Sequence, residues 1–312
     1  SRVDGITWLE SDAALLIGTA GAQLAAGPLD PGNGIAPDNI KAASQTRHKS
    51  AALEPALVAD RLLFIVAGGK DVREMRYSSD ADRFIAPSIV ADAAHMTETG
   101  LVAMTHAATP VSTLWAIRAD GLLLAALYDP DEQARGWTRQ PLGGVSDAAG
   151  APARAESLVA QIDPTGTFDQ VWLVVQRWIG GAVVRTIEYI DPPGDFPRTA
   201  VDAFHVDCGA TYDGAPATTI SGLDWLDGQT VQILADGMTH PDRVVTAGAV
   251  TLDRPASVAH VGLAMPWELV PLPPEGGRAD GPAQGALKRP PWCCACSTAW
   301  GCASARSAAR PT

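Results

Sequence analysis

Pairs of short apolar runs separated by a glycine turn recur along the chain, and this pattern constrains the fold more than any other feature. In "WAIRADGLLLAALY" (residues 115–128), Asp120-Gly121 separates two runs that are too short to be helices. Both central residues of a type I′ turn need positive φ, which Asp-Gly tolerates, so the stretch predicts a β-hairpin. The pattern recurs around Gly68-Gly69 (residues 62–77) and Gly180-Gly181 (residues 171–190), with a fainter copy in residues 14–24.

The spacing of the turn glycines indicates a structural repeat. Gly21, Gly69, Gly121 and Gly181 follow one another at intervals of 48, 52 and 60 residues. Since the blades of β-propellers repeat at about 40 to 50 residues, we predict an all-β chain in which residues 1–192 form a partial β-propeller of about four hairpin-containing blades. The alternative is a sandwich with irregular hairpins.

Further runs extend these units. Residues 101–107 precede the third hairpin, residues 135–142 follow it, and residues 155–164 precede the fourth. Residues 86–96 predict the one helical turn, with Ser88 as its N-cap, because a serine hydroxyl accepts a hydrogen bond from a first-turn N–H.

The strand pattern breaks at residues 191–200, "DPPGDFPRTA", where two close prolines each remove a backbone donor, so we place a domain boundary there. Residues 201–268 contain five or six short strand-like runs, and this predicts a small β-barrel. Residues 269–285 are rich in proline and glycine and predict a linker.

Charge and cysteine are unevenly distributed. The net charge of −12 argues against wrapping nucleic acid by phosphate neutralisation. Residues 286–312 hold four of the five cysteines, four basic residues and no acidic one, so the other 285 residues carry −16 and a single cysteine, Cys208. No apolar run approaches the roughly 18 residues of a membrane helix. The sequence opens without Met or a signal peptide, directly on a strand-like run, so we expect a fragment of a longer protein.

Three interpretations are open for residues 286–312. Cys293, Cys296 and Cys302 could ligate a metal, although no second ligand pair or histidine follows them. The segment could instead be a disordered or redox-active tail. The interpretation we favour is translation out of frame: reading two bases later turns Trp292-Cys293 into Val and Cys293-Cys294 into Leu, and it permits an ordinary amphipathic segment.

Motifs for the common chemistries are missing from the sequence. The glycine turns lack the spacing of G-x-G-x-x-G and Walker phosphate loops, and no G-x-S-x-G pentapeptide marks a serine hydrolase. No two histidines stand at i and i+4 among His48, His95, His106, His205, His240 and His260. We therefore predict a non-enzymatic protein with no catalytic, cofactor-binding or metal-ligating residues and no cofactor.

Carboxylates at hairpin ends are the more serious enzyme candidates, because glycosidases use two carboxylates about 5 to 10 Å apart. The candidates are Asp120, Asp129, Asp169, Glu188 and Asp191. Aspartate is also common in turns because its side chain caps nearby backbone, and we favour this structural role for each of them.

Tryptophans raise the possibility of a lectin, since exposed aromatic rings stack on sugars. Trp115 and Trp172 occupy equivalent places in their hairpins, and Trp8 is a possible third member of this set. Equivalent large residues in successive blades usually pack between the blades, so we predict core packing for Trp115 and Trp172. Trp137, Trp178 and Trp267 are less constrained.

Residues 60–268 resemble the nozzle, or tail-stabilisation, proteins of short-tailed phages and prophages. The likeness rests on "LLFIVAGGKDVREMRY", "HMTETGLVAM", "LWAIRADGLLLAALYD" with "GWTR", and "VWLVVQRWIGGAVVRTIEYI", together with the second module from "DCGATYDG" to "HPDRVV". The module is similar to the small β-barrel that follows the propeller in such proteins, whose fold is likened to a domain of ubiquitin-activating enzymes without any implied activity.

The resemblance implies a structural tail protein in the virion, synthesised in the bacterial cytoplasm. It also implies self-association into a homo-hexameric ring, contacts with neighbouring tail or adaptor rings, and DNA that passes through without sequence-specific binding; no membrane is involved. Family members are longer at the N-terminus and continue in frame after the barrel, and both departures fit a truncated prophage gene. A carbohydrate-binding or carbohydrate-cleaving propeller is the alternative function.

Overall fold

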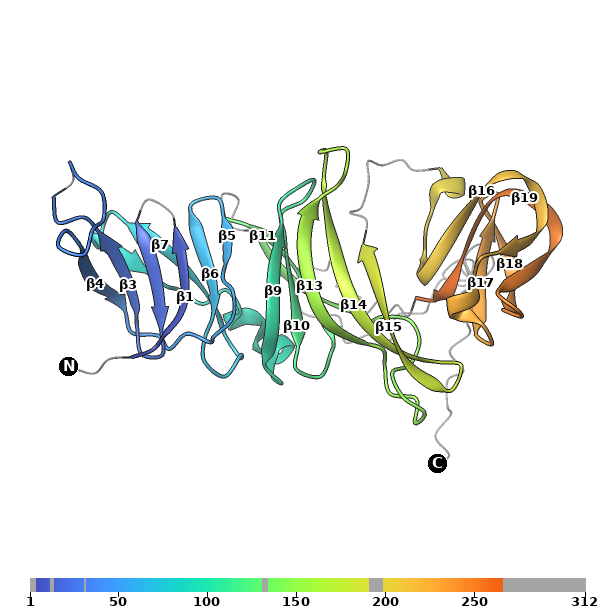
Figure 1. Ribbon diagram of the computed structural model, residues 1–312, viewed down its shortest axis with the longest axis horizontal. Helices are drawn as coiled ribbons and strands as arrows, with labels where there is room; N and C mark the ends of the chain where they lie inside the picture. Colours follow the sequence, from blue (N-terminus) through green and yellow to red (C-terminus); the bar gives the residue numbers. More distant parts are fainter. Residues whose placement is uncertain (1–3, 12–13, 31, 131–133, 191–198, 266–312) are drawn as a thin grey trace, which may run out of the picture. The chain divides into compact units, whose positions relative to one another are not determined.

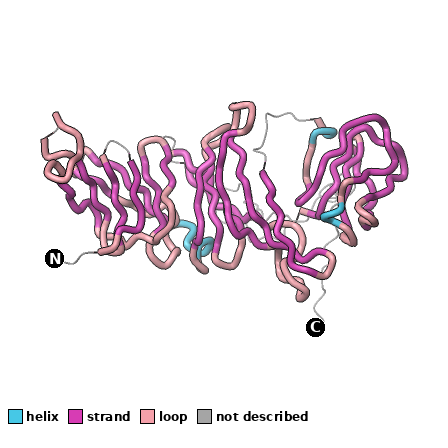
Figure 2. Tube along the Cα trace, in the orientation of Figure 1, coloured by secondary structure: helices cyan, strands magenta, loops and turns pink. Residues whose placement is uncertain are grey.

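The described part of the chain consists almost entirely of strands and turns. The structure, a computed structural model, describes residues 4–11, 14–30, 32–130, 134–190 and 199–265. These residues form five antiparallel sheets, none of which closes on itself, so the all-β prediction is confirmed. Figure 2 shows how short the helical segments are. None of the described helices is long and apolar enough to cross a membrane.

The first three sheets are meanders of four sequential strands (Figure 1). The first sheet contains β1 (Ile6–Ser11), β2 (Leu15–Thr19), β3 (Gln23–Gly27) and β4 (Lys41–Thr46). The second contains β5 (Ala56–Val58), β6 (Arg61–Ile65), β7 (Val72–Ser78) and β8 (Arg83–Ile85). The third contains β9 (Leu101–Ala107), β10 (Thr113–Arg118), β11 (Leu123–Asp129) and β12 (Ala134–Gln140).

The fourth sheet has three strands, β13 (Arg154–Ile162), β14 (Asp169–Ile179) and β15 (Ala182–Ile190). All four predicted hairpins are confirmed, as the pairs β2–β3, β6–β7, β10–β11 and β14–β15. The strands predicted beside the third and fourth hairpins are β9, β12 and β13.

The turn type predicted at Asp120-Gly121 is wrong. Gly121 has φ +87°, but Asp120 is not among the residues with positive φ. The Gly121 N–H donates to the Arg118 carbonyl at 2.9 Å, and the Arg118 N–H donates to the Leu122 carbonyl at 2.9 Å. This is the pattern of a three-residue loop that ends in a left-handed glycine, in which the first two loop residues need no positive φ. Gly180 and Gly181, with φ of 60° and 81°, form a two-residue turn with positive φ at both central residues, which is the geometry that the sequence predicted for Asp120-Gly121.

The predicted helical turn is present as the 3₁₀ segment η1 (Ala91–Thr97), but Ser88 is not its cap. Val90 occupies the N-cap position without a side-chain hydrogen bond. The Ser88 hydroxyl instead donates to the Asp71 carboxylate at 2.5 Å and accepts the Val90 N–H at 3.2 Å. The serine therefore ties the turn back to the start of β7.

The first four sheets pack through successive apolar cores. Trp8 and Leu16 of the first sheet contact Leu62 and Phe64 of the second. Leu63 and Ile65, on the opposite face of β6, pack with Leu114 and Leu124 of the third sheet. Ile117 and Leu123, on the opposite face of that sheet, pack with Val171, Leu173 and Val175 of the fourth. On the first three sheets we call the face that packs on the following sheet the forward face, and the opposite one the rear face. On the fourth sheet the rear face is the one that carries Val171 and Leu173 and packs on the third sheet, and the forward face is the opposite one.

The fifth sheet has the order β16-β19-β17-β18. Its strands are β16 (Val206–Ser221), β17 (Thr230–Ala235), β18 (Met238–Val244) and β19 (Ala249–Ala264), accompanied by the 3₁₀ turns η2 (Ala200–Asp202) and η3 (Asp224–Leu226). The prediction of five or six short strands is wrong, because β16 and β19 are each 16 residues long. Their pairing shifts register at three places, and Cys208 in β16 has φ +50°. Such bulges bend a long strand without ending it.

The fourth and fifth sheets share a buried joint. Ile179 of β14 packs among Ile220, Val231 and Leu263 of the fifth sheet. The Asp207 carboxylate accepts the Gly143 N–H, and Gly143 in turn accepts a hydrogen bond from Arg177 of β14 at 2.8 Å. The predicted domain boundary at residues 191–200 falls mainly on residues outside the described part, as do the predicted linker, 269–285, and the tail, 286–312.

Candidate functional site

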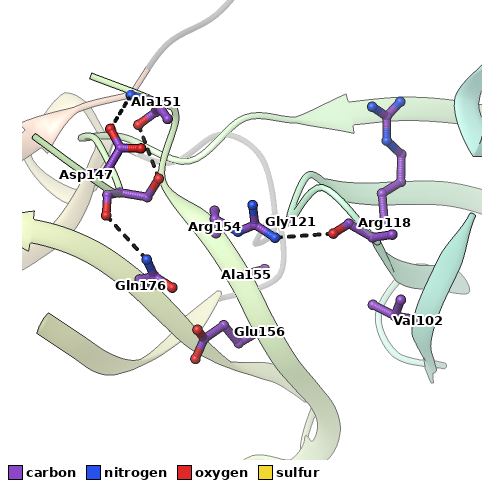
Figure 3. A pocket seen from close by; sticks show the side chains of 11 residues that line it. Val102, Arg118, Gly121, Asp147, Ala151, Arg154, Ala155, Glu156 and Gln176 are labelled. Carbon is purple, nitrogen blue, oxygen red and sulfur yellow. Dashed lines mark hydrogen bonds between the residues drawn. The ribbon is translucent and has the colours of Figure 1, made fainter. Parts of the chain in front are cut away.

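A cleft of about 430 Å³ opens beside the turn between β10 and β11. Its walls come from that turn, from the loop at Ser146–Ala151, from the start of β13 and from Gln176 of β14 (Figure 3). Gly121 brings the turn close to β13, since a Cβ atom there would lie 2.7 Å from the Cβ atom of Arg154. The cleft therefore exists where the third and fourth sheets meet.

Most polar groups of the cleft hold its walls together. Arg154 donates through Nη2 to the Ala119 carbonyl at 3.2 Å, and Gln176 donates through Nε2 to the Ser146 carbonyl at 3.3 Å. The Asp147 carboxylate accepts the N–H groups of Ala149 and Ala151 at 2.9 and 3.0 Å. Figure 3 shows several of these bonds spanning the opening. They build a fixed rim.

Two carboxyl groups beside the cleft have lowered pKa values. The side-chain hydrogen bond from Arg118 lowers the pKa of Asp120, and the bond from Arg185 lowers that of Glu156. General acid catalysis at neutral pH needs a carboxyl group with a raised pKa. Neither of these groups suits that role.

The other predicted carboxylates are also engaged within the fold. Asp169 accepts the N–H groups of Ala108 and Thr109 at 2.6 and 3.0 Å, and so it ties the fourth sheet to the third. Glu188 pairs with the buried Arg177. Asp129 ends β11, and Asp191 lies outside the described residues. Asp120, Asp169 and Glu188 are thus each held by hydrogen bonds within the fold.

The tryptophans follow a common rule. Trp8 and Trp115 lie on the forward faces of the first and third sheets: Trp8 packs 5.7 Å from the Phe64 ring, and Trp115 packs against the core shared with the fourth sheet. Trp172 occupies the forward face of the fourth sheet, because its neighbours Val171 and Leu173 face rearward. Core packing is thus confirmed for Trp115, whereas Trp172 packs beside Tyr189 of its own sheet, with ring centroids 5.2 Å apart.

Trp137 and Trp178 lie in different environments. Trp137 donates through Nε1 to the Ile89 carbonyl at 3.2 Å, and Trp178 is half-buried on β14. Trp267 lies outside the described residues.

The forward face of the fourth sheet is open and carries large apolar side chains next to the exposed Arg185, which is paired with Glu156. Val159, Trp172 and Tyr189 form one row across its three strands, and Val174 pairs with Ile187 in the next. The side chain of Ile187 is 74% exposed and that of Tyr189 is 51% exposed.

The rear face of the first sheet has the same character. Leu9 opposes Ile17, which opposes Leu24, while Ile6 opposes Thr19. Leu9 is 54% exposed and Ile6 is 62% exposed. The first and fourth sheets thus each have one covered apolar face and one open apolar face.

Sequence reasoning missed these two faces. The available signal was the composition of the strands: "AVVRTIEYI" of β15 carries large apolar residues at both parities, which is typical of a strand meant to be buried on both sides. The glycine turns by themselves do not indicate how many faces each strand buries.

The described histidines and cysteine form no metal site. Among the described residues, no group of three or more His, Cys, Asp or Glu side chains could hold a metal ion. His106 bonds to Ser112 at 2.9 Å and His260 to Thr211 at 2.8 Å. Burial raises the pKa of Cys208 to about 12, so its thiol stays protonated. Cys293, Cys296 and Cys302 lie outside the described residues.

Neither the scan against protein-family models nor the search of curated proteins finds a match for this chain.

Proposed function

We propose that the chain is a non-enzymatic structural component of a phage or prophage tail, in which residues 1–192 contribute part of a β-propeller and residues 201–268 a small barrel-type module. Support for the propeller comes from four successive antiparallel sheets, each built from neighbouring strands and each packed on the next. Propeller blades are built and packed in this way.

The observation that carries the proposal is the kind of surface the fold leaves open. The candidate catalytic carboxylates Asp120, Asp169 and Glu188 are held by partners inside the fold. The open surfaces at the first and fourth sheets are apolar sheet faces. Large apolar patches on a protein surface mark contacts with other macromolecules.

In this proposal the chain self-associates into a ring, a hexamer by the family resemblance, and contacts neighbouring tail or adaptor rings. DNA passes through without sequence-specific binding. The net charge of −12 supports passage, because an acidic surface does not retain phosphate.

A carbohydrate-binding function is the second candidate, and one observation favours it. The rings of Trp172 and Tyr189 lie side by side on the open forward face of the fourth sheet. Paired aromatic rings with one free side can stack on a sugar. A glycan array with the wild-type chain and Tyr189→Ala would separate the two functions, and the structural function predicts no saturable binding by either.

The tail function is tested directly on particles. Phage-like particles released from the source bacterium after DNA-damage induction are purified on a density gradient and analysed by peptide mass spectrometry. We expect peptides from residues 61–190 to band with the particles. Their recovery in the soluble fraction, with none in the particle band, would rule out the tail function.

A further inference from the structure

The first four sheets pack on one another in the same direction. The forward face of the first sheet covers the rear face of the second, and the same arrangement follows from the second to the third and from the third to the fourth. The middle sheets are therefore buried on both faces: on β6, Leu62 and Phe64 face rearward while Leu63 and Ile65 face forward.

Within this series, the rear face of the first sheet and the forward face of the fourth sheet are not covered by another of the four sheets. The rear face of the first sheet presents the exposed Ile6 and Leu9, next to the partly buried Leu24 and the buried Ile17. The forward face of the fourth presents Val159, Trp172, Val174, Ile187 and Tyr189. The forward face of the fourth sheet also carries Arg185, which is paired with Glu156, and the side chains named above are uncharged. Each face has the chemistry of a sheet–sheet interface that lacks its second half.

We propose that a second copy of this chain supplies that half, with the rear face of its first sheet docked on the forward face of the fourth sheet. Trp172 points to this occupant. Its counterparts Trp8 and Trp115 are each covered by the rear face of a following sheet. The rear face of another first sheet offers Leu9 and Ile6, whose exposures of 54% and 62% leave room for new contact.

A face-to-face dimer of two fourth sheets fits the observations less well. It would join two forward faces, whereas each contact among the first four described sheets joins a forward face to a rear face. The head-to-tail contact is heterologous, because the two chains use different surfaces. Each copy in it keeps one free face of each kind, so association continues until a ring closes or a filament forms. This interface does not depend on a role in a tail.

The test uses the full chain and one charge on each face. Leu9→Arg blocks the rear face of the first sheet, and Ile187→Arg blocks the forward face of the fourth. Both side chains are more than half exposed, so neither change disturbs a core. Val244→Arg, at a 55% exposed position of the fifth sheet, is the matched control. Circular dichroism and thermal unfolding verify folding, and light scattering coupled to size-exclusion chromatography gives the mass.

We expect the wild-type chain and Val244→Arg to form species larger than a dimer, and each face variant to be monomeric. An equimolar mixture of the two face variants should form a dimer, because each supplies the face that the other has lost. Ile6→Asp and Tyr189→Lys, at the same two faces, serve as a second pair if an arginine variant unfolds.

Two results would overturn the proposal. One is a wild-type chain that stays monomeric over a wide concentration range. The other is a dimer that Ile187→Arg abolishes and Leu9→Arg leaves intact, since this would assign the contact to two fourth sheets.

Discussion

The guanidinium group of Arg177 is fully buried and forms a two-pronged ion pair with Glu188 on the neighbouring strand. Nη2 lies 3.1 Å from Oε2 of Glu188, and Nη1 contacts the other carboxylate oxygen. Nε donates to the Gly143 carbonyl at 2.8 Å, and Nη1 also donates to the Thr186 hydroxyl at 3.2 Å. The pair thus anchors the loop to which the Asp207 carboxylate of the fifth sheet also binds.

Arg177→Met should lower the free energy of unfolding by about 3 to 5 kcal/mol, because it leaves the partly buried Glu188 carboxylate without its charged partner. Urea denaturation followed by circular dichroism measures the change. Arg185→Met, which breaks the exposed pair with Glu156, is the control and should cost much less, because surface ion pairs contribute little to stability. The double variant Arg177→Met/Glu188→Leu should recover most of the loss; equal losses for the two arginine variants would contradict the assigned role.

Gly121→Val should destabilise the chain by about 1 to 3 kcal/mol, because a β-branched residue is strained at positive φ. Two alanine variants separate strain from contact: Gly121→Ala also meets Arg154, whereas Gly166→Ala has φ +75° and nothing within 4 Å. Thermal unfolding should show a larger loss for Gly121→Ala than for Gly166→Ala. An unchanged melting temperature in Gly121→Val would refute the turn.

Gly18→Ala should loosen the first sheet, because a Cβ atom there would lie 2.0 Å from the Trp8 ring. Overpacking of this kind costs about 1 to 3 kcal/mol. Gly27→Ala, on β3 of the same sheet with nothing within 4 Å of its Cβ position, is the control. Equal unfolding midpoints for the two variants would mean that Trp8 is free to move away.

The stability of the Asp207→Asn variant relative to that of the wild type should increase as pH rises. Burial raises the pKa of Asp207 above its ordinary value, although the Gly143 N–H and Arg177 favour the carboxylate. The folded chain therefore binds this proton more readily than the unfolded chain, and its contribution to stability is lost as pH rises through the folded pKa. The difference in unfolding free energy between the variant and the wild type should grow from acid toward neutral pH. A difference that shrinks would show the opposite shift.

The hairpins could be predicted from sequence because glycine at positive φ is a local requirement. Gly180 and Gly181 fulfil it in full, while Asp120 shows that the same dipeptide serves more than one loop type. The long strands β16 and β19 could not be predicted, because the bulges that interrupt their pairing resemble strand ends in the sequence.

The open faces could be predicted only in part. The sequence shows that β15 is apolar at both parities, but it does not show which side finds a partner. That depends on how sheets distant in sequence pack, as Asp169 illustrates by reaching Ala108 and Thr109 some 60 residues away. Sequence motifs likewise do not indicate which side chains form hydrogen bonds with Glu188 and Asp120.

The strand order of the first four sheets has a consequence for synthesis. Each sheet is built from strands that are neighbours in sequence, so it can form as soon as its own residues have left the ribosome. The apolar forward face of the most recently formed sheet then stays exposed until the next sheet is made. As translation proceeds, each new sheet in turn has its forward face exposed. A pause after the second sheet has formed, beyond Ile85, would expose Leu63 and Ile65, and a pause after the third has formed, beyond Gln140, would expose Ile117. The rate of elongation through the interval between two sheets therefore sets how long a nascent chain can be captured by the wrong partner.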